Sequence, residues 1–232
     1  MVRVTLVGED LVGLERGDPA ASIRLLLPRG DGRLELPTWT GNEFRWADGV
    51  RARIRTLTPL ALRDDTAAVE LDLDVVLHDD APLTVWARSA VPGDEAAVSG
   101  TGSGYEIDPA VSSYVLLGDE SAVPAIATLL EELPATAAVV VHLERRALAE
   151  PVALPDHPGA SVTWSVLPEG APPGDTLVAA AAEVPVGPDV RVWAAGEAAA
   201  VQRIRKVLFD ERGLSRRGSS VRGYWKAGRE GT

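Results

Sequence analysis

The sequence predicts a two-domain protein of the β plus α/β class, in which an antiparallel β-barrel is followed by a doubly wound parallel sheet. The length of 232 residues favours two modest domains over one small domain. Up to residue 107 the chain has short alternating segments separated by Gly, Pro and Asp turns, which is typical of a small barrel. After residue 110, apolar segments alternate with amphipathic ones, as in a parallel sheet covered by helices on both faces. We therefore expect domains at 1–107 and 108–232.

The composition excludes several classes of function. A net charge of −11 argues against general nucleic-acid binding, because phosphates are repelled by a negative surface. The absence of cysteine excludes disulfides, thiolate metal ligands and a cysteine nucleophile. The three histidines are widely separated and show no metal-binding spacing, so we expect no metal site.

The apolar segments are short. None approaches the roughly 20 residues that cross a bilayer. The first residues, MVRVTLVGEDLVG, turn acidic early and do not resemble a signal peptide. We therefore expect a cytoplasmic protein without a membrane partner.

The expected barrel strands follow a period of two. In 68–78, apolar residues alternate with acidic ones, which predicts one buried and one solvated face. A short helix is expected at 82–90. The glycine-rich GTGSG at 100–104 is interpreted as a linker or barrel exit rather than a phosphate loop, because no apolar helix follows it. The full set of expected barrel strands is 2–8, 21–28, 33–37, 50–58 and 68–78.

The second domain alternates strands with helices. Helix 119–134 carries apolar residues at a spacing of 3.6, and helix 197–213 does so too and ends at Gly213. A third helix is expected at 176–184. The expected strands are 113–118, 137–144, 161–167 and 190–196.

The C-terminal stretch 212–229 is basic and aromatic in an otherwise acidic chain. It has six Arg or Lys residues, no Asp or Glu, and the adjacent Tyr224 and Trp225. One interpretation is a patch that attracts an anionic ligand. The alternative is a frayed, solvated terminus anchored by Tyr224 and Trp225.

Five motifs in order resemble the siderophore-interacting protein family, flavin-dependent ferric-siderophore reductases built on the ferredoxin-reductase plan. They are RTLTPL (55–60), ELDLDVVLH (70–78) with APLTVWARSAVPGD (81–94), LLGDESAVPAIATLLEELP (116–134), WAAGEAAAVQRIRKVLFDERGL (193–214) and VRGYWKAG (221–228). The resemblance implies an FAD-binding barrel at 1–107 and an NAD(P)H-binding-like domain at 108–232. It also implies reduction of a ferric siderophore from Fe(III) to Fe(II) in the cytoplasm by a monomer, with NADH or NADPH as reductant.

The resemblance also implies which residues hold the flavin. The family's Arg-x-Tyr-Ser/Thr motif is matched by Arg55 and Thr58, whereas Leu57 replaces the tyrosine and Leu60 replaces a second arginine. The alternative for this segment is a strand whose arginines are only solvated. For His78 the alternative to a flavin contact is a hydrogen-bonded histidine in a turn. For Trp86 the alternative is a side chain of the barrel core. The implied flavin contacts are Arg55, Thr56, Leu57, Thr58, Val76, His78, Thr84, Val85 and Trp86, with the pyrophosphate at Thr84 and Val85.

The segment GDESAV (118–123) stands where related reductases have a phosphate-binding loop. Asp119 and Glu120 lie at the expected start of a helix, where a carboxylate competes with a phosphate. Helix capping by Asp119 or Ser121 is the alternative. The same alternative to phosphate binding applies to Gly196 and Glu197. The sequence therefore does not distinguish NADH, NADPH and another electron donor.

The resemblance gives the basic stretch a role. Arg222 and Lys226 are expected to attract the anionic ferric siderophore. No catalytic acid, base or nucleophile is expected, because electron transfer to the metal moves no substrate proton. Two alternatives remain open: a flavin reductase or diaphorase with a non-iron substrate, and a non-catalytic siderophore-binding module that has lost flavin.

Overall fold

A computed structural model describes residues 1–64, 68–77, 81–146 and 151–228. The chain divides into two compact units, of which the first ends at Gly104 and the second begins at Tyr105. His78, one of the expected flavin contacts, lies outside the described residues. None of the described helices has the length and apolar character that crossing a membrane requires.

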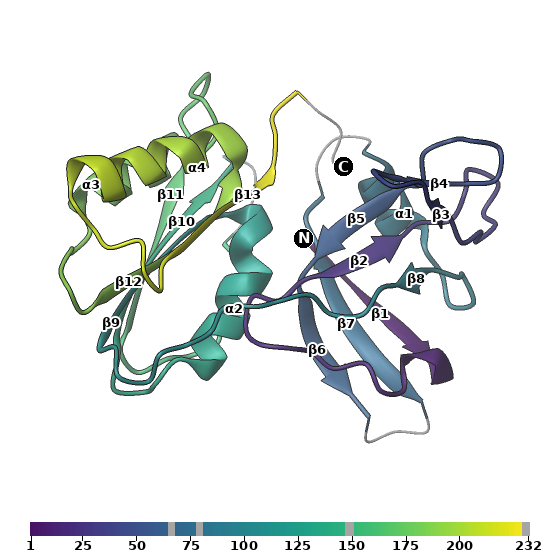
Figure 1. Cartoon of the computed structure of the whole chain (residues 1–232), viewed down its shortest axis with the longest axis horizontal. Helices are drawn as coiled ribbons and strands as arrows, with labels where there is room; N and C mark the ends of the chain where they lie inside the picture. The colour runs from purple at the N-terminus through teal and green to yellow at the C-terminus, as the bar shows by residue number, and fades with distance from the viewer. Residues whose placement is uncertain (65–67, 78–80, 147–150, 229–232) are drawn as a thin grey trace. The chain divides into compact units, whose positions relative to one another are not determined.

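The first unit consists of antiparallel strands and one α-helix (Figure 1). Three sheets have the strand orders β1-β7-β6, β5-β2-β8 and β3-β4. Helix α1 spans Pro82–Ser89 and a 3-10 turn spans Glu9–Leu11. The strands are β1 (Val2–Gly8), β2 (Ile23–Leu26), β3 (Thr38–Trp39), β4 (Phe44–Arg45), β5 (Ile54–Leu57), β6 (Pro59–Arg63), β7 (Val69–Val75) and β8 (Ala97–Val98).

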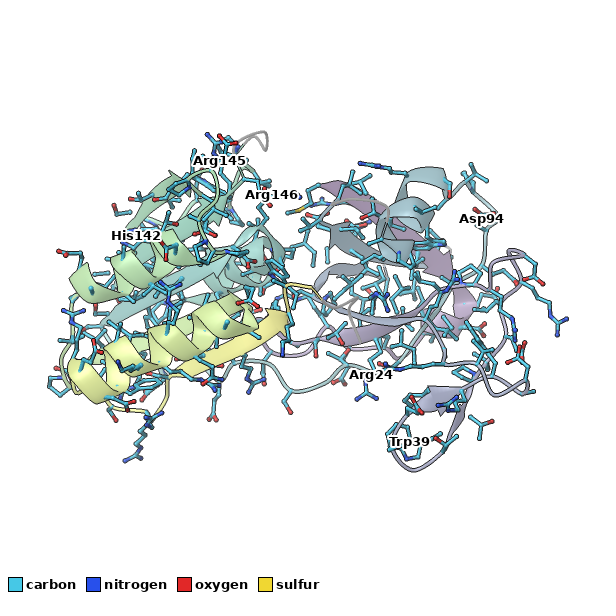
Figure 2. All side chains as sticks on the ribbon, turned by 90° about the horizontal axis from the view of Figure 1, so that it is seen from above. Arg24, Trp39, Asp94, His142, Arg145 and Arg146 are labelled. Carbon is cyan, nitrogen blue, oxygen red and sulfur yellow. The ribbon has the colours of Figure 1, made fainter. Side chains whose placement is uncertain are left out.

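The expected strand at 33–37 is wrong. These residues form no strand, and the neighbouring hairpin is built instead by β3 and β4. Leu34 packs against a buried cluster that includes Trp46, whereas Leu36 is exposed, so the alternating pattern here does not create one buried face. Pro37 lacks the N–H that a sheet requires. Trp39 lies on the hairpin and is exposed (Figure 2).

The core of the first unit lies between β2 and β7. Ile23 and Leu25 pack against Leu71 and Leu73, and α1 contributes Leu83 and Trp86 to the same cluster. The alternation expected for β7 is therefore confirmed on its apolar face.

The solvated face expected for β7 is wrong at Asp72, which is only 5% exposed. Arg63 donates to both carboxylate oxygens of Asp72, at 2.7 and 2.9 Å. The hydroxyl of Thr5 donates to Asp72 Oδ1 at 2.7 Å. Buried carboxylates require such partners, and here neighbouring strands supply them.

The second unit is a five-stranded parallel sheet with the order β11-β10-β9-β12-β13. The chain starts at β9 in the middle, adds β10 and β11 on one side, and then adds β12 and β13 on the other. The order therefore reverses between β9 and β12, which is the switch point of a doubly wound sheet. The expected fold class is confirmed. The strands are β9 (Ser113–Asp119), β10 (Ala138–Arg145), β11 (Ala160–Val166), β12 (Val190–Glu197) and β13 (Ser220–Trp225).

Helices cover both faces of this sheet. Leu177 of α3 (Asp175–Glu183) and Val201 of α4 (Ala198–Arg205) share a core cluster with Val115 and Val192. On the other face, Ile126 of α2 lies close to Gly118. A 3-10 turn, Glu120–Ala122, precedes α2, which spans Val123–Glu132.

The last expected helix changes geometry along its length. After α4 the chain continues as a π-helix, Lys206–Glu211, and Gly213 adopts a positive φ of 71°. The guanidinium of Arg212 donates to the carbonyls of Ala181 and Val184 at 2.9 and 2.6 Å. The first cation of the basic stretch is therefore a structural tie to the end of α3.

The basic stretch is ordered up to Trp225 and is not a frayed terminus there. Residues Ser220–Trp225 pair in parallel with β12 as the edge strand β13. Val221 is buried in the core cluster, and its carbonyl accepts a hydrogen bond from Arg205. Arg216 pairs with Asp210 at 2.8 Å.

Candidate functional site

The expected flavin segment spans the end of β5 and the start of β6. Arg55 and Leu57 pair with Leu25 and Ile23 of β2, and Leu57 packs against the core of the unit. Arg55 is half-buried and donates from Nη1 to the carbonyl of Ile54 at 2.8 Å. Because alternate residues share a face, Arg55 lies on the same face as Leu57.

The remaining residues of this region differ in exposure. Thr56 is exposed, whereas Thr58 is buried between the two strands. Val76 directly follows β7 and is half-buried. Their flavin contacts remain predictions.

Helix α1 is the expected place of the flavin pyrophosphate. Ala81 occupies the N-cap position and makes no side-chain capping hydrogen bond, and Pro82 begins the helix. The backbone N–H groups of the first turn are therefore not capped by the N-cap side chain. Thr84 is 1% exposed, whereas Val85 is exposed to solvent.

Trp86 gives an independent indication on the same helix. Its indole Nε1 is buried and has no hydrogen-bond partner within the described part of the chain. A buried, unsatisfied donor is uncommon in a native protein and calls for an acceptor. A buried indole donor without a partner among the described residues fits a ligand rich in acceptor atoms, as FAD is.

In the second unit, the switch point is occupied by the carboxylate of Asp119, the last residue of β9. Asp119 is 8% exposed. Its Oδ1 accepts from the N–H and hydroxyl of Ser121 at 2.9 and 2.5 Å. Its Oδ2 accepts from Trp225 Nε1 at 2.7 Å and from the N–H of Glu197 at 3.0 Å. The expected capping by Asp119 is confirmed.

Glu197 occupies the corresponding place at the end of β12 and is 4% exposed. Its Oε2 accepts from the N–H groups of Ala199 and Ala200 at 2.6 and 2.9 Å, so it caps α4. Its Oε1 accepts from the N–H of Ala227 at 3.2 Å. Burial raises the pKa of Glu197, but these N–H donors outweigh burial, and the pKa lies below its ordinary value.

Two glycines allow this arrangement. A Cβ on Gly196 would lie 2.6 Å from Asp119 Oδ2. A Cβ on Gly118 would lie 2.5 Å from the Cβ of Ala122. The strands therefore end close to the helix starts only because these side chains are absent.

Neighbouring charges at this edge are also paired. Arg146, which follows β10, donates to Glu120 at 2.9 Å. Glu144, at the end of β10, is buried and accepts from the N–H groups of Gly174 and Thr176 at 2.6 and 3.0 Å. Three neighbouring strands thus each place a carboxylate on the start of a helix or turn.

The aromatic pair of the basic stretch anchors β13. Trp225 donates to Asp119, and Tyr224 lies edge-on to Trp193 with ring centroids 6.1 Å apart. Arg222 and Lys226 are exposed. Their role in substrate binding remains a prediction.

Sequence reasoning missed the contact of Trp225 and Glu197 with Asp119. The signal that points to it is positional, because Asp119, Glu197 and Trp225 each end a strand. The carboxyl ends of parallel strands meet at one edge of a sheet. The sequence pattern did not reveal that the C-terminal stretch is itself a strand.

Family models and related proteins match nearly the whole chain. Residues 1–104 match the siderophore-interacting FAD-binding domain, and residues 111–228 match the siderophore-interacting protein family. The ferric vibriobactin reductase ViuB of Vibrio cholerae is 30% identical over 99% of this chain and 85% of its own length.

Solved structures agree with this assignment. A siderophore utilization protein from T. fusca is 36% identical, with a TM-score of 0.80 over 99% of this chain and 88% of that chain. Phthalate dioxygenase reductase shares the fold at 11% identity, with a TM-score of 0.57 over 98% of this chain and 65% of that chain. The expected ferredoxin-reductase plan is confirmed, and the chain belongs to the siderophore-interacting protein family.

Proposed function

We propose that the protein is an FAD-dependent oxidoreductase that reduces a ferric siderophore and so releases iron in the cytoplasm. The observation that carries the proposal is the similarity along the whole chain to the ferric vibriobactin reductase. The match of residues 1–104 to a siderophore-interacting FAD-binding domain supports the cofactor.

The chemistry requires a carrier that exchanges electrons in pairs and singly, which FAD supplies when bound. Two electrons from the reductant reduce two Fe(III) chelates to Fe(II). Siderophores are built for the hard Fe(III) ion, so the reduced metal is held more weakly. The protein needs to bind the cofactor and to admit the chelate. No side chain needs to exchange a proton with the siderophore.

In this proposal the first unit holds FAD. The N–H groups at the start of α1, near Thr84 and Val85, bind the pyrophosphate. The buried Nε1 of Trp86 donates to an acceptor atom of the cofactor. Thr56, Leu57, Thr58, Val76 and His78 complete the proposed contacts, together with the charge of Arg55.

The second unit attracts the iron chelate. Ferric siderophores are commonly anionic, and the chain carries a net charge of −11. The exposed cations Arg222 and Lys226 give a local positive potential against this background. We propose NADH or NADPH as reductant and a monomer as the working form.

The direct test is reconstitution of the full chain with excess FAD, followed by an absorption spectrum and an anaerobic assay with a ferric siderophore. We expect two visible flavin bands that bleach with reductant and recover when the ferric chelate is added. A protein that stays colourless, with no change in flavin fluorescence, contradicts the proposal. A protein that binds flavin and reduces quinones but no ferric chelate supports a diaphorase instead.

A further inference from the structure

Doubly wound sheets bind dinucleotides in one characteristic way. The pyrophosphate lies at the switch point, where it accepts hydrogen bonds from free N–H groups at a helix start. The switch point of this sheet lies between β9 and β12. The residues that follow these strands decide whether a pyrophosphate finds free donors.

The donors after β9 are already used. The N–H and hydroxyl of Ser121 both donate to Asp119 Oδ1. A phosphate at this place would have to displace a buried carboxylate that four hydrogen bonds hold.

The donors after β12 are used in the same manner. Ala199 and Ala200 donate to Glu197 Oε2, and Glu197 Oε1 is held by Ala227. The glycine at this strand end does not open space for a ligand. A Cβ on Gly196 would meet Asp119 Oδ2, so the carboxylate of Asp119 fills the space that the glycine leaves.

Asp119 and Glu197 belong to one hydrogen-bond network that links three strands. Asp119 on β9 accepts from the backbone of Glu197 on β12 and from Trp225 on β13. The closed switch point is therefore part of the packing of the sheet, and not a side chain that a ligand displaces by rotation.

We propose that Asp119 and Glu197 exclude the pyrophosphate of a dinucleotide from the switch point, so that the electron donor is recognised by its dihydronicotinamide ring alone. This inference rests on the proposed function for the identity of the donor. It predicts that the adenosine diphosphate part of NADH contributes little to binding.

The test uses ADP-ribose, which has the pyrophosphate but no nicotinamide. The full chain is titrated by calorimetry and by amide NMR. We expect no binding tighter than about 1 mM. A tighter complex that shifts the amides of Ser121, Ala199 and Ala200 overturns the proposal.

The matched variants are Asp119→Ala and Glu197→Ala, separately and together. Alanine removes the carboxylate and leaves the N–H groups of Ser121, Ala199 and Ala200 without a side-chain cap. We expect the double variant to gain ADP-ribose affinity by at least about tenfold. Glu211→Gln removes one charge at the surface, where Glu211 pairs with Lys206, and should gain nothing.

Folding of each variant is checked by circular dichroism, and a single variant replaces the double one if the latter is unfolded. Folded alanine variants that still do not bind ADP-ribose overturn the assignment to these carboxylates. Because ADP-ribose binding needs neither flavin nor iron, this outcome is independent of the reductase activity.

A kinetic comparison adds a second readout. Reduced nicotinamide mononucleotide, which lacks the pyrophosphate, should reduce the bound flavin at a rate within about threefold of NADH. A loss of more than about a hundredfold contradicts the proposal.

Discussion

Trp225 Nε1 donates a hydrogen bond to Asp119 Oδ2 over 2.7 Å, between residues 106 positions apart in the sequence. This bond joins β13 to β9, which are the last and the first strand of the sheet in sequence order. It gives the C-terminal aromatic pair a structural role and satisfies part of a buried carboxylate.

Replacing Trp225 with Phe removes that donor and keeps most of the ring. Burial raises the pKa of Asp119 above its ordinary value, and donors such as Ser121 and Trp225 offset this only in part. We expect the variant to lose about 1–3 kcal/mol of unfolding free energy, because a buried carboxyl group loses a hydrogen-bond partner. Urea denaturation measures the loss. Trp39→Phe on the exposed hairpin is the control and should change little; equal stability of both variants would show that the bond is not important.

Replacing Trp86 with Phe separates flavin binding from stability. Because Nε1 has no partner in the described protein, its removal should not lower the melting temperature without FAD. If the indole donates to the cofactor, FAD affinity should fall by about five- to tenfold. Flavin fluorescence titration gives the affinity, again with Trp39→Phe as control. Unchanged affinity would exclude Trp86 as a polar flavin contact.

Asp72 predicts an acid-dependent loss of stability in the first unit. The hydrogen bonds from Arg63 lower the pKa of Asp72 more than burial raises it, and Thr5 lowers it further. A carboxyl whose folded pKa is lowered stabilises the fold above its unfolded pKa of about 3.9 and loses this effect as the pH falls through the folded pKa. Asp72→Asn should therefore flatten the dependence of the urea midpoint on pH below about 4. Parallel profiles for the two proteins would show that Asp72 does not contribute.

Reversing the charges of Arg222 and Lys226 tests the proposed substrate contact. We expect the double Glu variant to raise the KM for an anionic ferric chelate by about tenfold at low salt, with less effect at high salt. Turnover of a neutral quinone should be unchanged. Arg217→Glu changes the charge at another exposed residue and is the control. An equal loss with chelate and quinone would argue against a role in attracting the chelate.

The periodic patterns predicted most of the secondary structure. The strand expected at 2–8 is β1, and the helix expected at 82–90 is α1, Pro82–Ser89. These elements are set by local alternation and by Pro82 at a helix start, which short stretches of sequence contain. The strand expected at 33–37 failed because alternation alone does not tell whether a partner strand is present.

The sequence by itself determined the fold class, the family and the carboxylate at the start of the helix after β9. Only the tertiary structure decided that Asp119, Glu197 and Trp225 share one hydrogen-bond network and that Asp72 is buried. It alone also showed that the Nε1 of Trp86 has no hydrogen-bond partner among the described residues. The physical reason is the separation along the sequence over which each interaction acts. Hydrophobic period and capping residues act over a few neighbours, whereas contacts across 106 positions depend on the order in which strands assemble.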